Sequence, residues 1–278
     1  MPTLTQDLRE KVEAAAKRVR INIIKMLTKA GNGHPGGSLG MTDIFVSLYQ
    51  GGIVRHDPRN PKWEGRDRVV LSNGHICPVL YAALADCGYF PEEWLWELRQ
   101  VGANLQGHPA MHKTPGIEAS TGSLGHGFAM SVGMALGLRH SGGDQRVVAL
   151  LGDGECQEGL IWEAAMSAPH FKLDNLVAIV DRNDAQIDGT TEDVMSIEPF
   201  ADKWRAFGWN VIEIDGHDFS QIFDAMAKAH AHSGQPTCII ATTTMGKGVR
   251  FMEEEGYKWH GKAPNQAQAE VALAELGA

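Results

Sequence analysis

The segment Val147-Val148-Ala149-Leu150-Leu151-Gly152-Asp153-Gly154-Glu155 decides the fold of this chain. Its apolar half has the length of a buried strand and is too short to cross a bilayer. The Gly-Asp-Gly turn lets the backbone approach a ligand closely. It also directs the Asp153 carboxylate to the carboxyl end of the strand, where open α/β sheets bind ligands. Taken alone, the motif is equally compatible with an ordinary strand-to-helix turn that has a capping aspartate.

The alternation of apolar strands and helices continues through the second half of the chain. It predicts strands at 146–151, 175–181, 209–214 and 237–242, and helices at 159–168, 199–207 and 219–231. Continuously apolar strands separated by helices indicate a parallel sheet that is covered on both faces. We therefore predict an α/β fold with a mostly parallel sheet and helices on both faces.

The first half is expected to add helices and one more strand. Apolar residues recur at helical spacing from Leu8 to Ala30, and Gly31-Asn32-Gly33 should end that helix. Further expected elements are a glycine-rich loop at 33–40, helices at 41–49, 92–99 and 127–138, a helix ending at Cys87, a strand at 68–71, and an alanine-rich helix or tail at 263–278. Without a repeat or linker, residues 1–278 are predicted to form a single domain.

Composition narrows the functional classes. The 278 residues are 43% hydrophobic and carry a net charge of −9, which makes nucleic acid a poor partner because duplex binding needs a basic face. No apolar run is long enough for a bilayer, and Met1–Glu10 lacks an apolar leader, so no membrane association is expected. Four scattered cysteines suggest neither a disulfide scaffold nor zinc, and a reducing cytoplasm is the simplest location.

A second strand end completes a candidate cation site. The strand predicted at 175–181 runs into Asn183 and Ala185, and the 28 residues from 155 to 182 suffice for one helix and one strand. The two strand ends should therefore lie close together. The Asp153 carboxylate, the Asn183 amide oxygen and a backbone carbonyl near Ala185 could hold a hard cation such as Mg²⁺, which completes its shell with phosphate oxygens.

Four histidines follow a glycine or tryptophan at predicted element ends: His34, His75, His108 and His260. A single histidine of this kind is usually structural, but four beside a candidate phosphate site suit the binding of hydroxyls and the movement of protons. A zinc site is the competing interpretation, although no HxxxH or HxxC pair supports it.

Two glycine-rich turns could bind anions. Thr121-Gly122-Ser123-Leu124-Gly125-His126-Gly127 opens a predicted helix, whose free N–H groups could bind an anion, or its glycines could simply allow close packing. Gly246-Lys247-Gly248 is either a phosphate loop or a flexible turn, and it does not follow the Walker pattern.

From about residue 10 to about residue 265, these segments together resemble the transketolase family. The matching motifs occur in the family's order: Gly33-His34-Pro35-Gly36-Gly37, Ser72-Asn73-Gly74-His75, Gly107-His108-Pro109, Thr121–Gly127, Gly152–Gly159 and Trp259-His260-Gly261-Lys262-Ala263-Pro264. The Gly-Asp-Gly and Asn pair is shared by thiamine-diphosphate enzymes generally, and the histidine loops narrow the resemblance to transketolase-like members. Three positions depart from the family pattern, which commonly has proline at Ser123, glutamine at His126 and a second asparagine at Asp184.

The resemblance implies a thiamine-diphosphate-binding fold of which only the diphosphate-binding domain is present. Asp153, Asn183 and the Ala185 carbonyl would then bind Mg²⁺ or Ca²⁺. The implied cofactor contacts are His75, Gly122, Ser123, Leu124, Gly154, Asn183, Ile187 and His260. The implied catalytic residues are His34, His108 and His260, of which His34 and His260 would bind sugar hydroxyls and His108 would lie by the first donor hydroxyl. Asp181 would brace the metal-binding strand, and Glu158 and Glu163 would lie at a subunit interface.

The implied activity is transfer of a two-carbon ketol unit from a ketose phosphate to an aldose acceptor, as in the pentose phosphate pathway. The family's pyrimidine-binding and C-terminal domains are expected on a partner chain, in a cytoplasmic dimer of heterodimers. The alanine-rich end, with Gly277 as a stop signal, favours a naturally split enzyme. Two alternatives stay open: another thiamine-diphosphate carboligation, of the deoxyxylulose-phosphate synthase or dehydrogenase E1 type, and a non-catalytic subunit that kept the fold.

Overall fold

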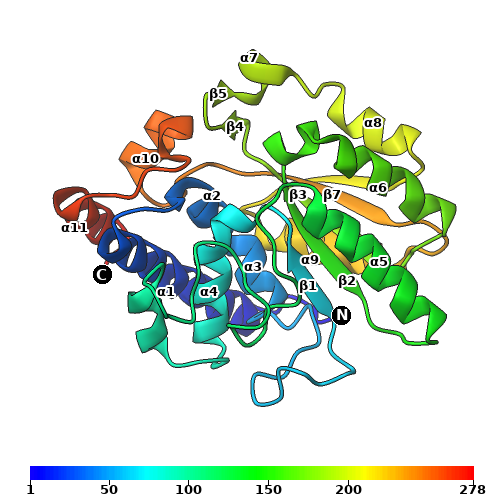
Figure 1. Ribbon diagram of the computed structural model, residues 1–278, viewed down its shortest axis with the longest axis horizontal. Helices are drawn as coiled ribbons and strands as arrows, with labels where there is room; N and C mark the ends of the chain where they lie inside the picture. Colours follow the sequence, from blue (N-terminus) through cyan, green and yellow to red (C-terminus); the bar gives the residue numbers. More distant parts are fainter.

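The computed structural model describes residues 1–278 and is built on one five-stranded parallel sheet (Figure 1). Its strands are β1 (Arg68–Leu71), β2 (Val147–Gly152), β3 (Leu176–Arg182), β6 (Asn210–Asp215) and β7 (Thr237–Thr242). They lie in the order β1-β2-β3-β7-β6, and every neighbouring pair is parallel. The predicted α/β fold with a parallel sheet is confirmed.

Alternate residues of the central strands enter two separate cores. In β2, Val148 and Leu150 belong to the larger core, whereas Val147, Ala149 and Leu151 belong to the smaller one. Successive side chains of a strand point to opposite faces, so a strand covered on both sides is apolar at every position. This geometry explains why β2 is an unbroken apolar run in the sequence.

Helices cover both faces of the sheet, as predicted (Figure 1). The larger core is covered by α1 (Gln6–Ala30), α3 (Thr42–Leu48), α4 (Cys77–Asp86), α9 (Phe219–Ala231) and α11 (Gln266–Glu275). The smaller core is covered by α5 (His126–His140), α6 (Gly159–His170) and α8 (Phe200–Ala206). The predicted stop of α1 is confirmed, because Gly31 adopts a left-handed φ of 69° and its N–H donates to the Leu27 carbonyl. None of the helices combines the length and the hydropathy that a membrane span requires.

The prediction of a loop at 33–40 is wrong, because these residues include the short helix α2 (Pro35–Gly40). Proline suits the first position of a helix, and all six residues of α2 are buried. The glycines allow this burial: a Cβ on Gly36 would lie 2.3 Å from Cγ of Met245. A glycine-rich motif that looks like a flexible loop is therefore a close-packed helix.

The helix predicted at 92–99 is instead the 3₁₀-helix η2 (Glu92–Glu97). Its backbone bonds span three residues, from Trp94 N–H to the Pro91 carbonyl and from Leu98 N–H to the Leu95 carbonyl. Short elements that were not predicted are η1 (Gly74–Ile76), η3 (Gly154–Gln157), β4 (Ala185–Gln186), β5 (Gly189–Thr190), α7 (Thr191–Met195), α10 (Arg250–Glu255) and η4 (Gly256–Trp259).

The carboxyl ends of four strands meet at one edge of the sheet. The backbone bonds continue past the strand ends: Ser72 N–H donates to the Leu150 carbonyl, and Asp153 N–H donates to the Asp181 carbonyl. Thr243 N–H likewise donates to the Arg182 carbonyl. The residues that follow β1, β2, β3 and β7 are thus held side by side, and the candidate site lies at this edge.

Candidate active site

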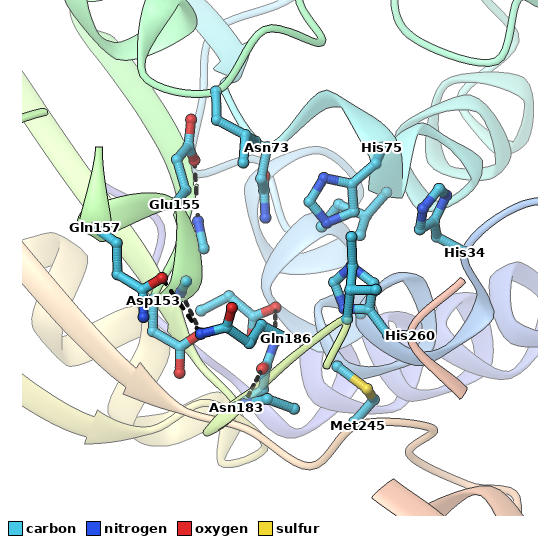
Figure 2. A pocket seen from close by; sticks show the side chains of 18 of the residues that line it. His34, Asn73, His75, Asp153, Glu155, Gln157, Asn183, Gln186, Met245 and His260 are labelled. Carbon is cyan, nitrogen blue, oxygen red and sulfur yellow. Dashed lines mark hydrogen bonds between the residues drawn. The ribbon is translucent and has the colours of Figure 1, made fainter. Parts of the chain in front are cut away.

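A cavity of about 560 Å³ opens at the carboxyl ends of the strands (Figure 2). The predicted site residues that line it are His34, His75, His108, Gly122, Leu124, Asp153, Gly154, Asn183, Ala185, Ile187 and His260. Ser123 is the one predicted site residue outside the lining, and it is exposed on the turn before α5. Segments that are more than two hundred residues apart in the chain, such as α2 and η4, are therefore brought to one cavity.

Asp153 follows β2 and is almost completely buried, with 1% of its surface exposed. One carboxylate oxygen, Oδ1, accepts from Gly154 N–H at 2.7 Å. The other, Oδ2, accepts from Asp184 N–H at 2.7 Å and from Arg182 Nη1 at 3.0 Å. Burial raises the pKa of Asp153, and the bond with Arg182 opposes that rise. The carboxylate is thus fixed in place by the ends of two adjacent strands.

Asn183 is oriented by its neighbour Asp181. The Asn183 amide nitrogen donates to Asp181 Oδ2 at 2.8 Å, and its Oδ1 accepts from Ala185 N–H at 3.0 Å. Asp181 also accepts from the Thr243 hydroxyl at the end of β7, and burial raises its pKa to about 7. Asp181 therefore determines which way the amide of Asn183 faces, as expected of a residue that braces this strand end.

The chain contains no group of three or more His, Cys, Asp or Glu side chains arranged to hold a metal ion. The zinc interpretation of the histidines is therefore not supported. An ion at the strand ends would need the amide oxygen of Asn183 and the carbonyl of Ala185 in addition to the carboxylate of Asp153. Such oxygen donors suit a hard cation, which needs only one or two carboxylates.

Three of the predicted histidines form a compact cluster on the other side of the cavity (Figure 2). The ring centroids of His34 and His75 are 5.0 Å apart, those of His34 and His260 are 5.5 Å apart, and those of His75 and His260 are 5.1 Å apart. Burial lowers the pKa of all three, to about 4 for His34. Burial also lowers the pKa of His108, with a smaller effect of Arg99. These imidazoles are neutral at neutral pH and can donate or accept hydrogen bonds.

Glu155 has a structural role that the sequence motif did not reveal. Its Oε1 accepts from the Ser72 hydroxyl at 2.5 Å and from Gly125 N–H at 2.8 Å, and its Oε2 accepts from Gly152 N–H at 3.1 Å. Burial raises its pKa to about 6. The Glu155 carboxylate thus joins the ends of β1 and β2 to the turn before α5. In the sequence, the only sign of this role was a second acidic residue directly after Gly-Asp-Gly.

The cavity lining also includes polar and sulfur-containing side chains that were missed, among them Asn73, Gln157, Gln186 and Met245. Asn73 Oδ1 is buried without a hydrogen-bond partner, and so is His34 Nδ1. Buried polar atoms normally have partners, so two orphaned atoms in residues of one cavity indicate that a ligand completes the site. The signal for Asn73 was its place two residues after the end of β1, at the same edge of the sheet as Asp153.

The family model for the transketolase thiamine-diphosphate-binding domain matches residues 11–278. The chain is 45% identical to the 6-deoxy-6-sulfo-D-fructose transketolase subunit SqwG of Clostridium sp. (strain MSTE9), over 92% of this chain and 94% of that protein. It is 42% identical to an apulose-4-phosphate transketolase subunit of Phocaeicola vulgatus, over 96% of this chain and 94% of that protein.

Larger transketolases match over only part of their length. Human transketolase is 38% identical over 94% of this chain, which spans 41% of that protein. The solved structure of transketolase from Leishmania mexicana superposes with a TM-score of 0.90 at 33% identity, over 96% of this chain and 41% of that one. These relatives are transketolases or their subunits, which favours ketol transfer over the synthase-like, dehydrogenase-like and non-catalytic alternatives.

Proposed function

The chain belongs to the transketolase family, as the N-terminal type of subunit of a split transketolase, and from this premise we propose how its residues serve ketol transfer. The proposed reaction moves a two-carbon ketol unit from a ketose phosphate to an aldose acceptor. The observation that carries the proposal is the single cavity in which Asp153 and Asn183 face a cluster of neutral histidines. One side suits a diphosphate and its cation, and the other suits a sugar.

We propose that thiamine diphosphate and Mg²⁺ or Ca²⁺ bind at the strand ends. Asp153, Asn183 and the Ala185 carbonyl would hold the cation, since hard cations prefer oxygen ligands. The orphaned Asn73 Oδ1 and the free space around Gly154, where an added Cβ meets nothing closer than 3.4 Å, fit a polar group lying against this backbone. When bound, the cofactor supplies the electron sink for breaking a carbon–carbon bond.

The proposed cofactor contacts lie around this anchor. Gly154 and the turn Gly122-Ser123-Leu124 would contact the diphosphate, and Ile187 would pack against the cofactor. Ile187 is 73% exposed at the cavity, which is unusual for a large apolar side chain and suits one that a ligand covers. His75 would face the diphosphate and the reaction centre.

The proposed catalytic residues are His34, His108 and His260. Because burial holds their pKa values below the ordinary range, they would approach a sugar as neutral imidazoles. His34 and His260 would bind sugar hydroxyls and accept or return the proton of a hydroxyl at the bond that breaks. His108 would hold the first hydroxyl of the donor. As neutral imidazoles, these histidines have a free lone pair at neutral pH and could accept a proton, with a driving force that the lowered pKa reduces.

We propose that activity requires a C-terminal partner chain with the pyrimidine-binding half of the site. The names of the subunit-type relatives and the 41% coverage of human transketolase support this division. Glu158 and Glu163 are exposed on or beside α6 and are available for a subunit interface. We further propose a dimer of heterodimers that acts in the cytoplasm on sugar phosphates, as in the pentose phosphate pathway.

Calorimetric titration and an activity assay test the proposal together. The chain is titrated with thiamine diphosphate in the presence of Mg²⁺, first alone and then with a C-terminal transketolase subunit, and ketol transfer is assayed with a panel of ketose phosphates. We expect tight cofactor binding and turnover only in the mixture. A mixture that binds the cofactor and transfers no ketol unit from any donor would contradict the proposed function.

A further inference from the structure

Arg182, at the end of β3, bridges the metal-site carboxylate and a neighbouring stretch of chain. Its Nη1 lies 3.0 Å from Asp153 Oδ2 and 3.0 Å from Asp184 Oδ1. Its Nη2 lies 3.0 Å from Glu198 Oε1 and 3.4 Å from Glu192 Oε1. A planar guanidinium presents several donors in fixed directions, so one arginine can bridge carboxylates that a lysine would contact one at a time.

The three outer carboxylates all belong to one stretch, residues 184–198, which we call the β4–α7 segment because it contains β4, β5 and α7. It begins with backbone strain, since Asp184 has a positive φ of 59°. Its apolar side chains contribute little to burial along α7, where Val194 and Met195 are 41% and 62% exposed. Ile197 packs into the smaller core near the end of the segment, so polar contacts matter most for the part that precedes it.

Those polar contacts converge on Asp153 and its surroundings. Asp184 N–H donates to Asp153 Oδ2 at 2.7 Å, and the Thr191 hydroxyl donates to the same oxygen at 3.3 Å. Gln157 Nε2 donates to the Met195 carbonyl at 2.7 Å. Arg182 is the one residue that joins Asp153 to the beginning, the middle and the end of the β4–α7 segment.

The position of this segment matters for the cavity. Ala185, Gln186 and Ile187 all lie in it, and all three line the cavity. The Ala185 carbonyl is a proposed cation ligand, and Ile187 is a proposed cofactor contact. A shift of the segment by an ångström would therefore displace two groups that the cofactor needs, and sites that are loose by this amount lose much of their function.

We propose that Arg182 is a positioning residue that fastens the β4–α7 segment to Asp153 and so places Ala185 and Ile187 in the cavity. The consequence for the cofactor rests on the proposed function, whereas the fastening itself concerns the chain alone. Charge supports this role: Asp153, Asp184, Glu192 and Glu198 would repel one another without the guanidinium between them.

Hydrogen exchange on the metal-free 278-residue chain tests the fastening directly. In Arg182→Gln, the amides of the β4–α7 segment should exchange ~10-fold faster than in the parent chain, while those of β2 and β3 stay unchanged. The matched control is Arg205→Gln, because Arg205 pairs with Asp202 and Glu213 and does not contact the segment. Equal exchange in the two variants would overturn the proposal.

A second variant tests the proposal even if Arg182→Gln does not fold. The double variant Glu192→Gln and Glu198→Gln changes exposed carboxylates and leaves the Arg182–Asp153 pair in place. It should speed exchange in the same segment by ~3-fold, since surface pairs are individually weak. Exchange at the parent rate would show that Arg182 does not hold the segment through these contacts.

Measurements of cofactor binding distinguish two possible roles of Arg182. It either holds the β4–α7 segment in place or competes with the cation for Asp153. With the partner chain present, the Mg²⁺ concentration that half-saturates thiamine-diphosphate binding should rise several-fold in Arg182→Gln and less in Arg182→Lys, which keeps the charge. A fall would show that Arg182 competes with the cation and would overturn the proposal. If the parent chain bound no thiamine diphosphate, the proposed function would fail, and the exchange experiment would still decide the role of Arg182.

Discussion

The two sides of the cavity differ in how the hydrogen-bonding capacity of their titratable side chains is satisfied. At the strand ends, Asp153, Glu155 and Asp181 are buried and each accepts at least two hydrogen bonds from the chain. On the opposite side, the rings of His34, His75 and His260 lie against one another, and His34 Nδ1 is buried without a partner.

This difference indicates which side of the cavity would hold the cofactor in place and which side would take part in the reaction. A carboxylate that accepts several bonds is held in one position, which suits the binding of an ion that demands fixed geometry. An imidazole with free nitrogen atoms keeps its donor and acceptor capacity for a ligand, and leaving such atoms buried costs stability until the ligand arrives. The strand-end side is therefore expected to control cofactor binding, and His34, on the histidine side, is expected to control turnover.

The largest effect is expected from Asp153→Ala on the strand-end side. It removes the only proposed carboxylate ligand, so thiamine-diphosphate binding should be lost by more than the ~100-fold that removal of an outer-shell group costs. Calorimetric titration with Mg²⁺ and the partner chain measures this. Asp202→Ala is the control, because Asp202 is exposed on α8 and pairs only with Arg205. Binding at parent affinity in Asp153→Ala would remove the basis for the anchor.

On the histidine side, His34→Ala should lower turnover and leave cofactor binding almost unchanged. Cofactor affinity should stay within ~3-fold of the parent, while kcat falls by ~10²-fold or more, as expected when a proton-transferring group is removed. Steady-state kinetics of the two-chain enzyme, together with titration, separates the two quantities. His232→Ala is the control, since His232 contacts Gln235 beyond the end of α9 and lies outside the cavity. Turnover at the parent rate would show that His34 has no part in the reaction.

The contribution of Glu155 to stability should depend on pH, and this dependence tests how the strand-end side of the cavity is stabilised. Burial raises its pKa from 4.5 to about 6, so the folded state binds a proton more tightly than the unfolded state does. The resulting stability is fully present below pH 4.5 and is lost as the pH rises through about 6. The difference in unfolding free energy between the parent and Glu155→Gln should therefore fall by about 2 kcal/mol over this interval.

Urea unfolding of both proteins between about pH 4 and pH 7 measures this difference. Asp181 also titrates with a raised pKa, but it is present in both proteins and its contribution cancels in the comparison. A difference that is constant, or that rises with pH, would mean that Glu155 is ionised in the fold with its three hydrogen bonds fully compensating for burial.

The sequence predicted the sheet and many residues of the candidate site because the signals were local. Apolar runs marked β2 and β3, and polar residues directly after them marked Asp153 and Asn183. Parallel strands place such residues at one edge, so adjacency in space followed from the order of elements. The resemblance to a family then connected the four histidine loops, whose distances in the chain carry no local signal.

What the sequence did not reveal depends on tertiary contacts. The glycines of α2 led to the prediction of a loop. A helix forms there because these residues are buried and Met245 packs closely against them. Glu155 gains its role from Ser72 and Gly125, which are distant in the chain. Nothing in the sequence indicated a role for Arg182, because its four carboxylate partners converge on it only in the folded chain.

The smallest effect is expected at Ser123, in the turn that Glu155 holds through Gly125 N–H. The His126 N–H donates to the Ser123 carbonyl, and Gly125 has a φ of 80°, as a type II turn requires at that position. The Ser123 N–H donates no hydrogen bond, so Ser123→Pro removes none, and by restricting the unfolded chain it should raise the unfolding free energy by ~0.5 kcal/mol. Thermal unfolding measures the change, and Ser123→Ala controls for loss of the hydroxyl. A loss of stability would instead show that Gly122, at φ 144°, cannot keep its conformation before a proline.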